Sequence, residues 1–306
     1  MASQVPALTP VTAVTTWQFV PLVSGPLLLL AALYLAGART VARQHPGRPW
    51  PRARTAAFIA GLAAIAVALQ GSDGVYDDVL LRAHMVQHLL LIMVAPPLLV
   101  YGRPVTLLLH AVKNPWHRRA IRVVRSPTVT VVTWPPFSVA LYSLVVLATH
   151  LTPLILATGW LHDGEHLAYL MAGYLYFLTV VGFEPARWRP SLFARYLLLL
   201  AAMPADIATG AALMLARPFG SFSASDVHAA GVIMLAGSEL IMTSLALLLA
   251  VNLVRSPGTA REAVSGLKEY NAYLSLLGSR TAQTGSPPPA GSWAGTRTGT
   301  EDERGQ

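Results

Sequence analysis

Two pairs of histidines with the same spacing are the residues of this sequence best suited to metal chemistry. His84 and His88 form one pair, and His162 and His166 form the other. A spacing of four residues places both imidazoles of a pair on one face of a helix, one turn apart. Neutral imidazole is a ligand for copper, zinc, iron and nickel. Because the sequence contains no cysteine, we expect a bound metal to have histidine, methionine or carboxylate ligands.

The first pair opens an apolar segment, Leu81–Tyr101, that is long enough to cross a lipid bilayer. The chain of 306 residues is 54% hydrophobic and only 12% charged, and its mean hydropathy is +0.52. This composition is typical of a membrane protein rather than of a soluble globular one. Ionisable side chains at the mouth of a membrane helix are costly, so both histidine pairs are functional candidates.

Hydropathy predicts an all-α polytopic membrane protein, a seven-helix transmembrane bundle. The expected spans are Phe19–Gly37, Thr55–Leu69, Leu81–Tyr101, Val129–His150, Glu165–Phe183, Tyr196–Leu215 and His228–Val254. Residues 17–255 form this membrane domain, and residues 1–16 form a short extracytoplasmic tail. Residues 256–306 are rich in Gly, Ser, Thr and Pro, so we expect a mostly disordered cytoplasmic tail with a helical patch near Ala263–Leu277.

The distribution of basic residues predicts the orientation of the bundle. The first, third and fifth loops hold fourteen Lys and Arg residues. The N-terminal tail and the other three loops, with their flanking helix ends, hold two, Arg82 and Arg217. By the positive-inside rule, the N-terminus lies outside and the C-terminus is cytoplasmic. The net charge of +8 therefore indicates contact with the lipid bilayer and not with a nucleic acid.

This topology places six histidines at the outer ends of their helices. These candidate metal ligands are His84, His88, His150, His162, His166 and His228. Glu165 and Asp226 are nearby oxygen ligands, or partners that orient the imidazoles. Taken singly, His150 and His228 also fit an ordinary interfacial role. The paired histidines are expected to converge into one site.

Two acidic residues lie deeper in the predicted bundle. At ~1.5 Å per residue, Asp206 and Glu239 each lie about 15 Å from a helix end, near the bilayer midplane. Acidic residues inside a membrane are functional candidates. We expect either an ion or proton relay below the histidines, or protonated carboxyls that form hydrogen bonds between helices.

One stretch of the chain resembles a known family. His84-Met-Val-Gln-His88, followed by Ala95-Pro96-Pro97-Leu98 and Gly102-Arg103-Pro104, is similar to the multi-span CtaG-like cytochrome c oxidase assembly factors associated with caa-type oxidases. The resemblance implies a multi-pass protein of the bacterial plasma membrane that helps to mature cytochrome c oxidase by supplying copper. Its implied partner is an oxidase subunit, or another copper protein, at the outer face.

The residues alone leave the metal open. The leading hypothesis is a copper-insertion factor and not an enzyme. A zinc-dependent intramembrane hydrolase is the alternative, because a zinc-bound water among His and Asp side chains suits amide or ester hydrolysis. A haem-binding membrane protein, with histidines as axial ligands, is the third possibility.

Overall fold

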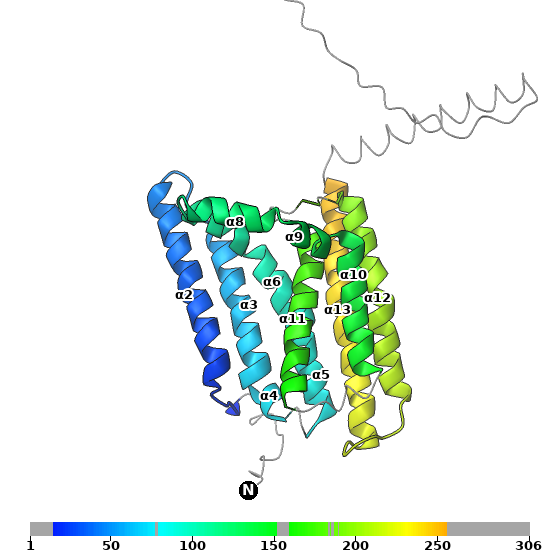
Figure 1. The fold of residues 1–306 in the computed structure, drawn as a ribbon. Coiled ribbons are helices and arrows are strands. Elements are labelled where there is room, and N and C mark those ends of the chain that lie inside the picture. Colours follow the sequence, from blue (N-terminus) through cyan, green and yellow to red (C-terminus); the bar gives the residue numbers. More distant parts are fainter. Residues whose placement is uncertain are drawn as a thin grey trace, which may run out of the picture. The chain divides into compact units, whose positions relative to one another are not determined.

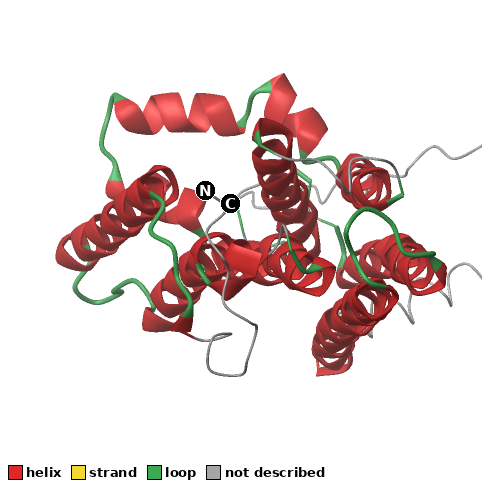
Figure 2. Cartoon of the chain, turned by 90° about the horizontal axis from the view of Figure 1, so that it is seen from below, coloured by secondary structure: helices red, strands yellow, loops and turns green. Residues whose placement is uncertain are grey.

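The computed structural model describes residues 15–76, 79–151, 159–182, 184, 187–188 and 190–255. The chain divides into two units, residues 1–251 and 252–306. The described helices belong to the first unit, apart from residues 252–255 at the end of the last helix. The described residues are helical and contain no strand. Long helices run beside one another in Figure 1, and Figure 2 shows several of them nearly end-on.

The long helices account for most of the described chain. They are α2 (Pro21–Gln44), α3 (Arg52–Gln70), α10 (Pro135–His150), α11 (Trp160–Val181), α12 (Leu192–Leu215) and α13 (Ala224–Arg255). The shorter elements are α4 (Ser72–Tyr76), α5 (Leu81–Leu89), η1 (Leu90–Val94), α6 (Ala95–Tyr101), α7 (Pro104–Ala111), α8 (Trp116–Val124) and α9 (Pro127–Val132). The predicted all-helical class is therefore confirmed.

Five helical segments of the described chain are long and apolar enough to cross a membrane. They are Pro21–Gln44, Arg52–Tyr76, Leu81–Ala111, Leu192–Leu215 and Ala224–Val251. The other two expected spans correspond to α10, which has 16 residues, and to α11, whose first two turns carry His162, Asp163, Glu165 and His166. The number of seven spans, and the orientation with the N-terminus outside and the C-terminus in the cytoplasm, stay predictions.

The segment expected as the third span is a continuous helix that contains one π-helical turn. Its first part, α5, is followed by the π-helical turn η1, and α6 then begins at Ala95. Pro96 and Pro97 explain the π-helical turn, because proline has no N–H to donate and its ring crowds the carbonyl one turn earlier. Such π-helical turns are frequent at functional sites.

The part of this helix around the π-helical turn packs closely on α11. A Cβ added to Gly173 of α11 would overlap the backbone carbonyl of Ile92 in η1 and would lie 2.8 Å from Cγ of Pro96. Only glycine permits this approach. Ile92 lies one turn after His88, and Gly173 lies two turns after His166. The contact therefore fixes the two helices that carry the histidine pairs.

The segments between the predicted spans are more helical than expected. The basic connection at residues 102–128 forms α7 and α8, and it contains the start of α9. The first helix also continues past Gly37 to Gln44. The expected span Val129–His150 is interrupted before Pro135, because α9 ends at Val132 and α10 begins at Pro135. Residues 1–14 and 256–306, including the helical patch expected near Ala263–Leu277, lie outside the described residues.

Candidate metal centre

Both histidine pairs lie on the helices and at the spacing that the sequence predicts. His84 and His88 are on α5, and His162 and His166 are in the first two turns of α11. The ring centroids are 4.0 Å apart within the first pair and 4.2 Å apart within the second. Between pairs, His84 stacks on His162 at 5.1 Å, and the His88 and His166 rings are 6.0 Å apart. The structure therefore brings the two pairs into one cluster.

His150, at the end of α10, is the fifth histidine of this cluster. Its ring centroid is 5.3 Å from that of His88, and its Nε2 lies 3.4 Å from Nδ1 of His88. His150 Nδ1 lies 2.9 Å from the carbonyl oxygen of Val146. We therefore place a hydrogen on Nδ1 of His150, which donates to this carbonyl, and leave its Nε2 to accept from Nδ1 of His88.

This assignment leaves a lone pair on Nε2 of His88, directed at a carboxylate. Nε2 of His88 lies 3.9 Å from Oε1 of Glu165, and both side chains are buried. Among the described residues, neither this nitrogen nor either carboxylate oxygen of Glu165 has a hydrogen-bond partner. Two buried atoms that carry lone pairs repel each other unless a cation or a proton lies between them.

The ligand atoms are close enough to share one metal ion. His84, His88 and Glu165 each offer one atom, and these atoms all lie within 4.8 Å of one another. Two metal–nitrogen bonds of ~2.1 Å span at most about 4.2 Å. Small side-chain rotations would therefore bring all three atoms into coordination. A set of imidazoles and one carboxylate suits copper or zinc, so these residues fit the metal that the sequence led us to expect.

Comparison with known proteins assigns the chain to a family. Residues 32–256 match the family of the cytochrome c oxidase caa3 assembly factor, Caa3_CtaG. The chain is a member of this family. This match covers both histidine pairs, His150 and Glu165, so the whole cluster belongs to the caa3 assembly factor region.

Three curated relatives extend the comparison to mycobacteria. Uncharacterized proteins of Mycobacterium leprae, Mycobacterium bovis and Mycobacterium tuberculosis are each 30% identical to this chain over 210 residues. The match covers 65% of this chain and 32% of each relative. The chain therefore spans about a third of the length of these relatives. No solved structure matches it.

Two polar residues that the sequence interpretation did not single out contact the histidine cluster. Oε1 of Gln87 lies 3.0 Å from Nε2 of His166, and Nε2 of Gln87 donates to the carbonyl of Ala68 on α3. The Tyr169 hydroxyl lies 2.9 Å from Nδ1 of His150. Gln87 adjoins His88, and Tyr169 follows His166 by three residues on the same helix face. Their places beside the histidine pairs are a weak signal in the sequence, because their partners lie on other helices.

Asp226 acts on the cluster through α5, the helix that carries His84 and His88. Its Oδ2 accepts a hydrogen bond of 2.6 Å from the backbone N–H of Leu81, the first residue of α5. Its Oδ1 lies 3.4 Å from Nε of Arg82. A carboxylate at the first turn satisfies an otherwise unpaired N–H and interacts favourably with the helix dipole. Asp226 therefore fixes the start of α5, three residues before His84.

The other predicted site residue at a helix end, His228, is not brought to the cluster. His228 is exposed, and its Nδ1 lies 3.5 Å from the carbonyl of Met214. No hydrogen bond or ring contact among the described residues joins His228 to the other five histidines. A position near the start of α13 gave it the expected depth, but its ring lies beside the carbonyl of Met214 on α12.

The two deeper acids differ from each other. Asp206 is completely buried, and the Tyr142 hydroxyl lies 3.2 Å from its Oδ1. Tyr142 precedes His150 by eight residues, which is about 12 Å along α10, so this carboxyl lies at another level than the cluster. Glu239 is partly exposed, and its Oε1 has no hydrogen-bond partner among the described residues. A relay role for either acid stays a prediction.

Proposed function

We propose that this protein binds copper at the histidine cluster and delivers it to a metal centre of cytochrome c oxidase. The membership of the caa3 assembly factor family supports a role in oxidase assembly. The copper-binding residues in this proposal are His84, His88, His150, His162 and His166, with Glu165. Copper is the cargo, and the protein acts by ligand exchange rather than by catalysing a reaction.

The observation that carries the proposal is the pair of facing acceptors, Nε2 of His88 and Oε1 of Glu165, which lie 3.9 Å apart. The nearby rings of His84 and His162, stacked at 5.1 Å, supply further nitrogen ligands. Having more imidazoles than one ion needs favours transfer, because a departing ion can exchange one nitrogen for another without losing coordination.

The cluster's place at the helix ends suggests where transfer occurs. His84 and His88 lie near the start of the helical segment Leu81–Ala111, His162 and His166 lie in the first two turns of α11, and His150 ends α10. With the chain direction that the positive-inside rule predicts, these ends face the outer side of a bacterial plasma membrane. The proposed recipient is an oxidase subunit, or another copper protein, at that surface.

A zinc-dependent hydrolase is the second candidate, and one observation favours it. Two histidines and one glutamate, here His84, His88 and Glu165, are also the ligand set of several catalytic zinc sites. Such a site would keep an open position for a water molecule that attacks an amide or ester.

Metal analysis of the full chain separates the candidates. The protein is purified through a tag without histidine, its metal content is measured, and the bound metal is offered to a copper-free oxidase subunit. We expect copper to bind and to transfer. Bound zinc together with hydrolysis of a model ester or amide would support the second candidate instead. A haem absorption band would contradict both.

A further inference from the structure

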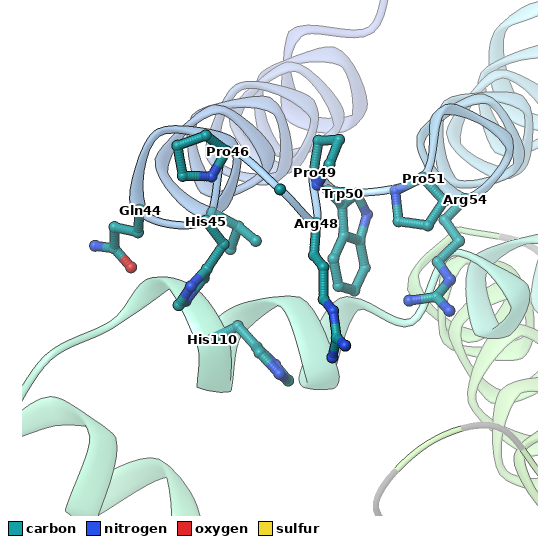
Figure 3. Close-up of a pocket in the computed structure, with 11 residues that line it drawn as sticks. Gln44, His45, Pro46, Arg48, Pro49, Trp50, Pro51, Arg54 and His110 are labelled. Atoms are coloured by element: carbon teal, nitrogen blue, oxygen red, sulfur yellow. The ribbon is translucent and has the colours of Figure 1, made fainter.

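A second site of a different kind lies at the other end of the bundle. An open cavity of about 830 Å³ lies between the end of α2, the segment leading to α3, and α7. Figure 3 shows His45, Arg48, Arg54 and His110 around it, with Trp50 as a wall. The lining contains no Asp or Glu. The cavity therefore concentrates positive charge and hydrogen-bond donors.

The arginine next to the indole is held in a fixed position. Cζ of Arg54 lies 4.9 Å from the centroid of the Trp50 ring. Nε1 of Trp50 donates a hydrogen bond of 3.0 Å to the hydroxyl of Tyr34, which donates in turn to the carbonyl of Gly102 at 2.6 Å. A guanidinium that stacks on an anchored ring loses little freedom when it binds an anion.

His110 leaves one ring nitrogen for a ligand. Its Nδ1 lies 2.7 Å from the carbonyl oxygen of Thr106, to which it donates. Nε2 therefore carries a lone pair, which can accept a hydrogen bond from a hydroxyl group of a ligand. The acid held against α7 does not compete for it, because the carboxylate of Glu184 accepts from the backbone N–H groups of Val105 and Thr106 at 3.0 and 2.9 Å. That carboxylate is occupied at the start of α7, one turn before His110.

An apolar groove follows the cavity along the same two helices. It has a volume of about 420 Å³, and its lining includes Leu33 and Gly37 of α2 and Leu107 and Leu108 of α7. Gly37 precedes the cavity residue Val41 by one turn, and Leu107 precedes His110 by three residues. A basic cavity at the end of an apolar groove matches a molecule with an anionic head and a hydrocarbon chain.

We propose that the cavity binds a phosphate group, presented by an anionic phospholipid whose acyl chain lies in the groove between α2 and α7. Arg48 and Arg54 bind the phosphate oxygens, since a guanidinium fork fits this geometry. An indole ring such as that of Trp50 favours the headgroup level of a bilayer. The α2–α3 connection and the start of α5 lie at opposite ends of the bundle (Figure 1), so this site is separate from the histidine cluster.

The test measures binding of defined lipids to the full chain in detergent by native mass spectrometry. The pocket variant is Arg48→Gln with Arg54→Gln. The control is Arg43→Gln with Arg52→Gln, which removes the same charge from exposed positions near the cavity that do not line it. We expect phosphatidylglycerol to bind the parent protein more tightly than phosphatidylcholine. The pocket variant should lose about 10-fold in affinity for each charge-assisted hydrogen bond removed.

The outcomes separate lipid from soluble phosphate. An equal loss in both double variants would mean general surface attraction, and no loss in the pocket variant would mean that Arg48 and Arg54 do not bind the lipid. Either result would overturn the proposal. Inorganic phosphate that binds as tightly as phosphatidylglycerol, and only to proteins with Arg48 and Arg54 intact, would keep the phosphate site and overturn the lipid assignment. Circular dichroism checks the fold, and the single Arg48→Gln variant, at an exposed position, repeats the test with less disturbance.

Discussion

Histidines occur at both ends of this bundle, in opposite surroundings. At one end, five buried or nearly buried rings face each other and the carboxylate of Glu165. At the other end, His45 and His110 are exposed beside Arg48 and Arg54. Ring nitrogens that face other acceptors need a cation between them, whereas a cavity lined by guanidinium groups favours an anion. Neighbouring charge, rather than the residue type, decides which ligand each group of histidines binds.

The largest effect expected from this comparison comes from exchanging one histidine of each group for alanine. His88→Ala should abolish copper retention, because it removes the nitrogen that faces Glu165 and the neighbour of His150. His110→Ala should leave copper binding unchanged. Equilibrium competition against a chelator of known affinity, with metal analysis of the retained protein, measures both.

Lipid binding is then measured for the same two variants, and we expect the opposite result. His88→Ala should bind phosphatidylglycerol as the parent protein does, and His110→Ala should bind it more weakly. This second measurement also shows that the His88→Ala protein is folded. Copper retained at the parent stoichiometry and affinity by His88→Ala would mean that the cluster is not the copper site.

The next largest effect concerns the close packing of α11 on η1. This packing should affect copper binding at the histidine cluster and not lipid binding at the basic cavity. Gly173→Ala places a methyl group against the Ile92 carbonyl and Pro96, so the helices must separate. Overpacking of this kind costs about 1–3 kcal/mol. Gly164→Ala on the same helix is the matched control, since nothing lies within 4 Å of its added Cβ. We expect a lower Tm and weaker copper binding for Gly173→Ala only, and an unchanged Tm would contradict this account of the contact.

Hydropathy and spacing predicted the helices and most members of the histidine cluster. A spacing of four residues fixed the faces of the pairs, and a common position at helix ends predicted that they meet. His150 joined them for the same reason. His228 had the same depth, but depth says nothing about the direction of a side chain around the helix axis. Its ring faces the Met214 carbonyl instead.

Other features depend on contacts between distant segments, which no local pattern encodes. Glu165 was predicted as a neighbour of the site, and the structure places it between His88 and His162, at 3.9 Å from each ring. Pro96 and Pro97 predict some disturbance of the helix before them, but they do not predict that it is the π-helical turn η1. Gln87 was overlooked because its importance comes from α3 and α11, which lie on either side of it.

Gln87 gives a smaller effect that tests positioning without removing a ligand. Gln87→Ala removes the contact with Nε2 of His166 and the hydrogen bond to the Ala68 carbonyl. Loss of a residue that orients a metal ligand typically costs ~10–100-fold in metal affinity. Gln44→Ala, in the wall of the basic cavity, is the matched control and should change nothing at the cluster. A copper affinity equal to that of the parent would show that α5 and α11 align their histidines without Gln87.

Asp226 should give the smallest effect, because it supports the start of α5 and lies outside the ligand set. Asp226→Asn keeps a side-chain oxygen for the Leu81 N–H and loses only the attraction to Arg82, whose side chain is 45% exposed. Pairs with one exposed partner contribute at most about 1 kcal/mol. Asp226→Ala also removes the cap, which costs a further ~0.5–2 kcal/mol. Thermal unfolding should therefore rank the parent above the Asn variant and the Asn variant above the Ala variant, with copper affinity falling in the same order by less than in Gln87→Ala. If Asp226→Asn instead lost copper as completely as His88→Ala, its carboxylate would be a metal ligand, and the centre would extend beyond the five histidines and Glu165.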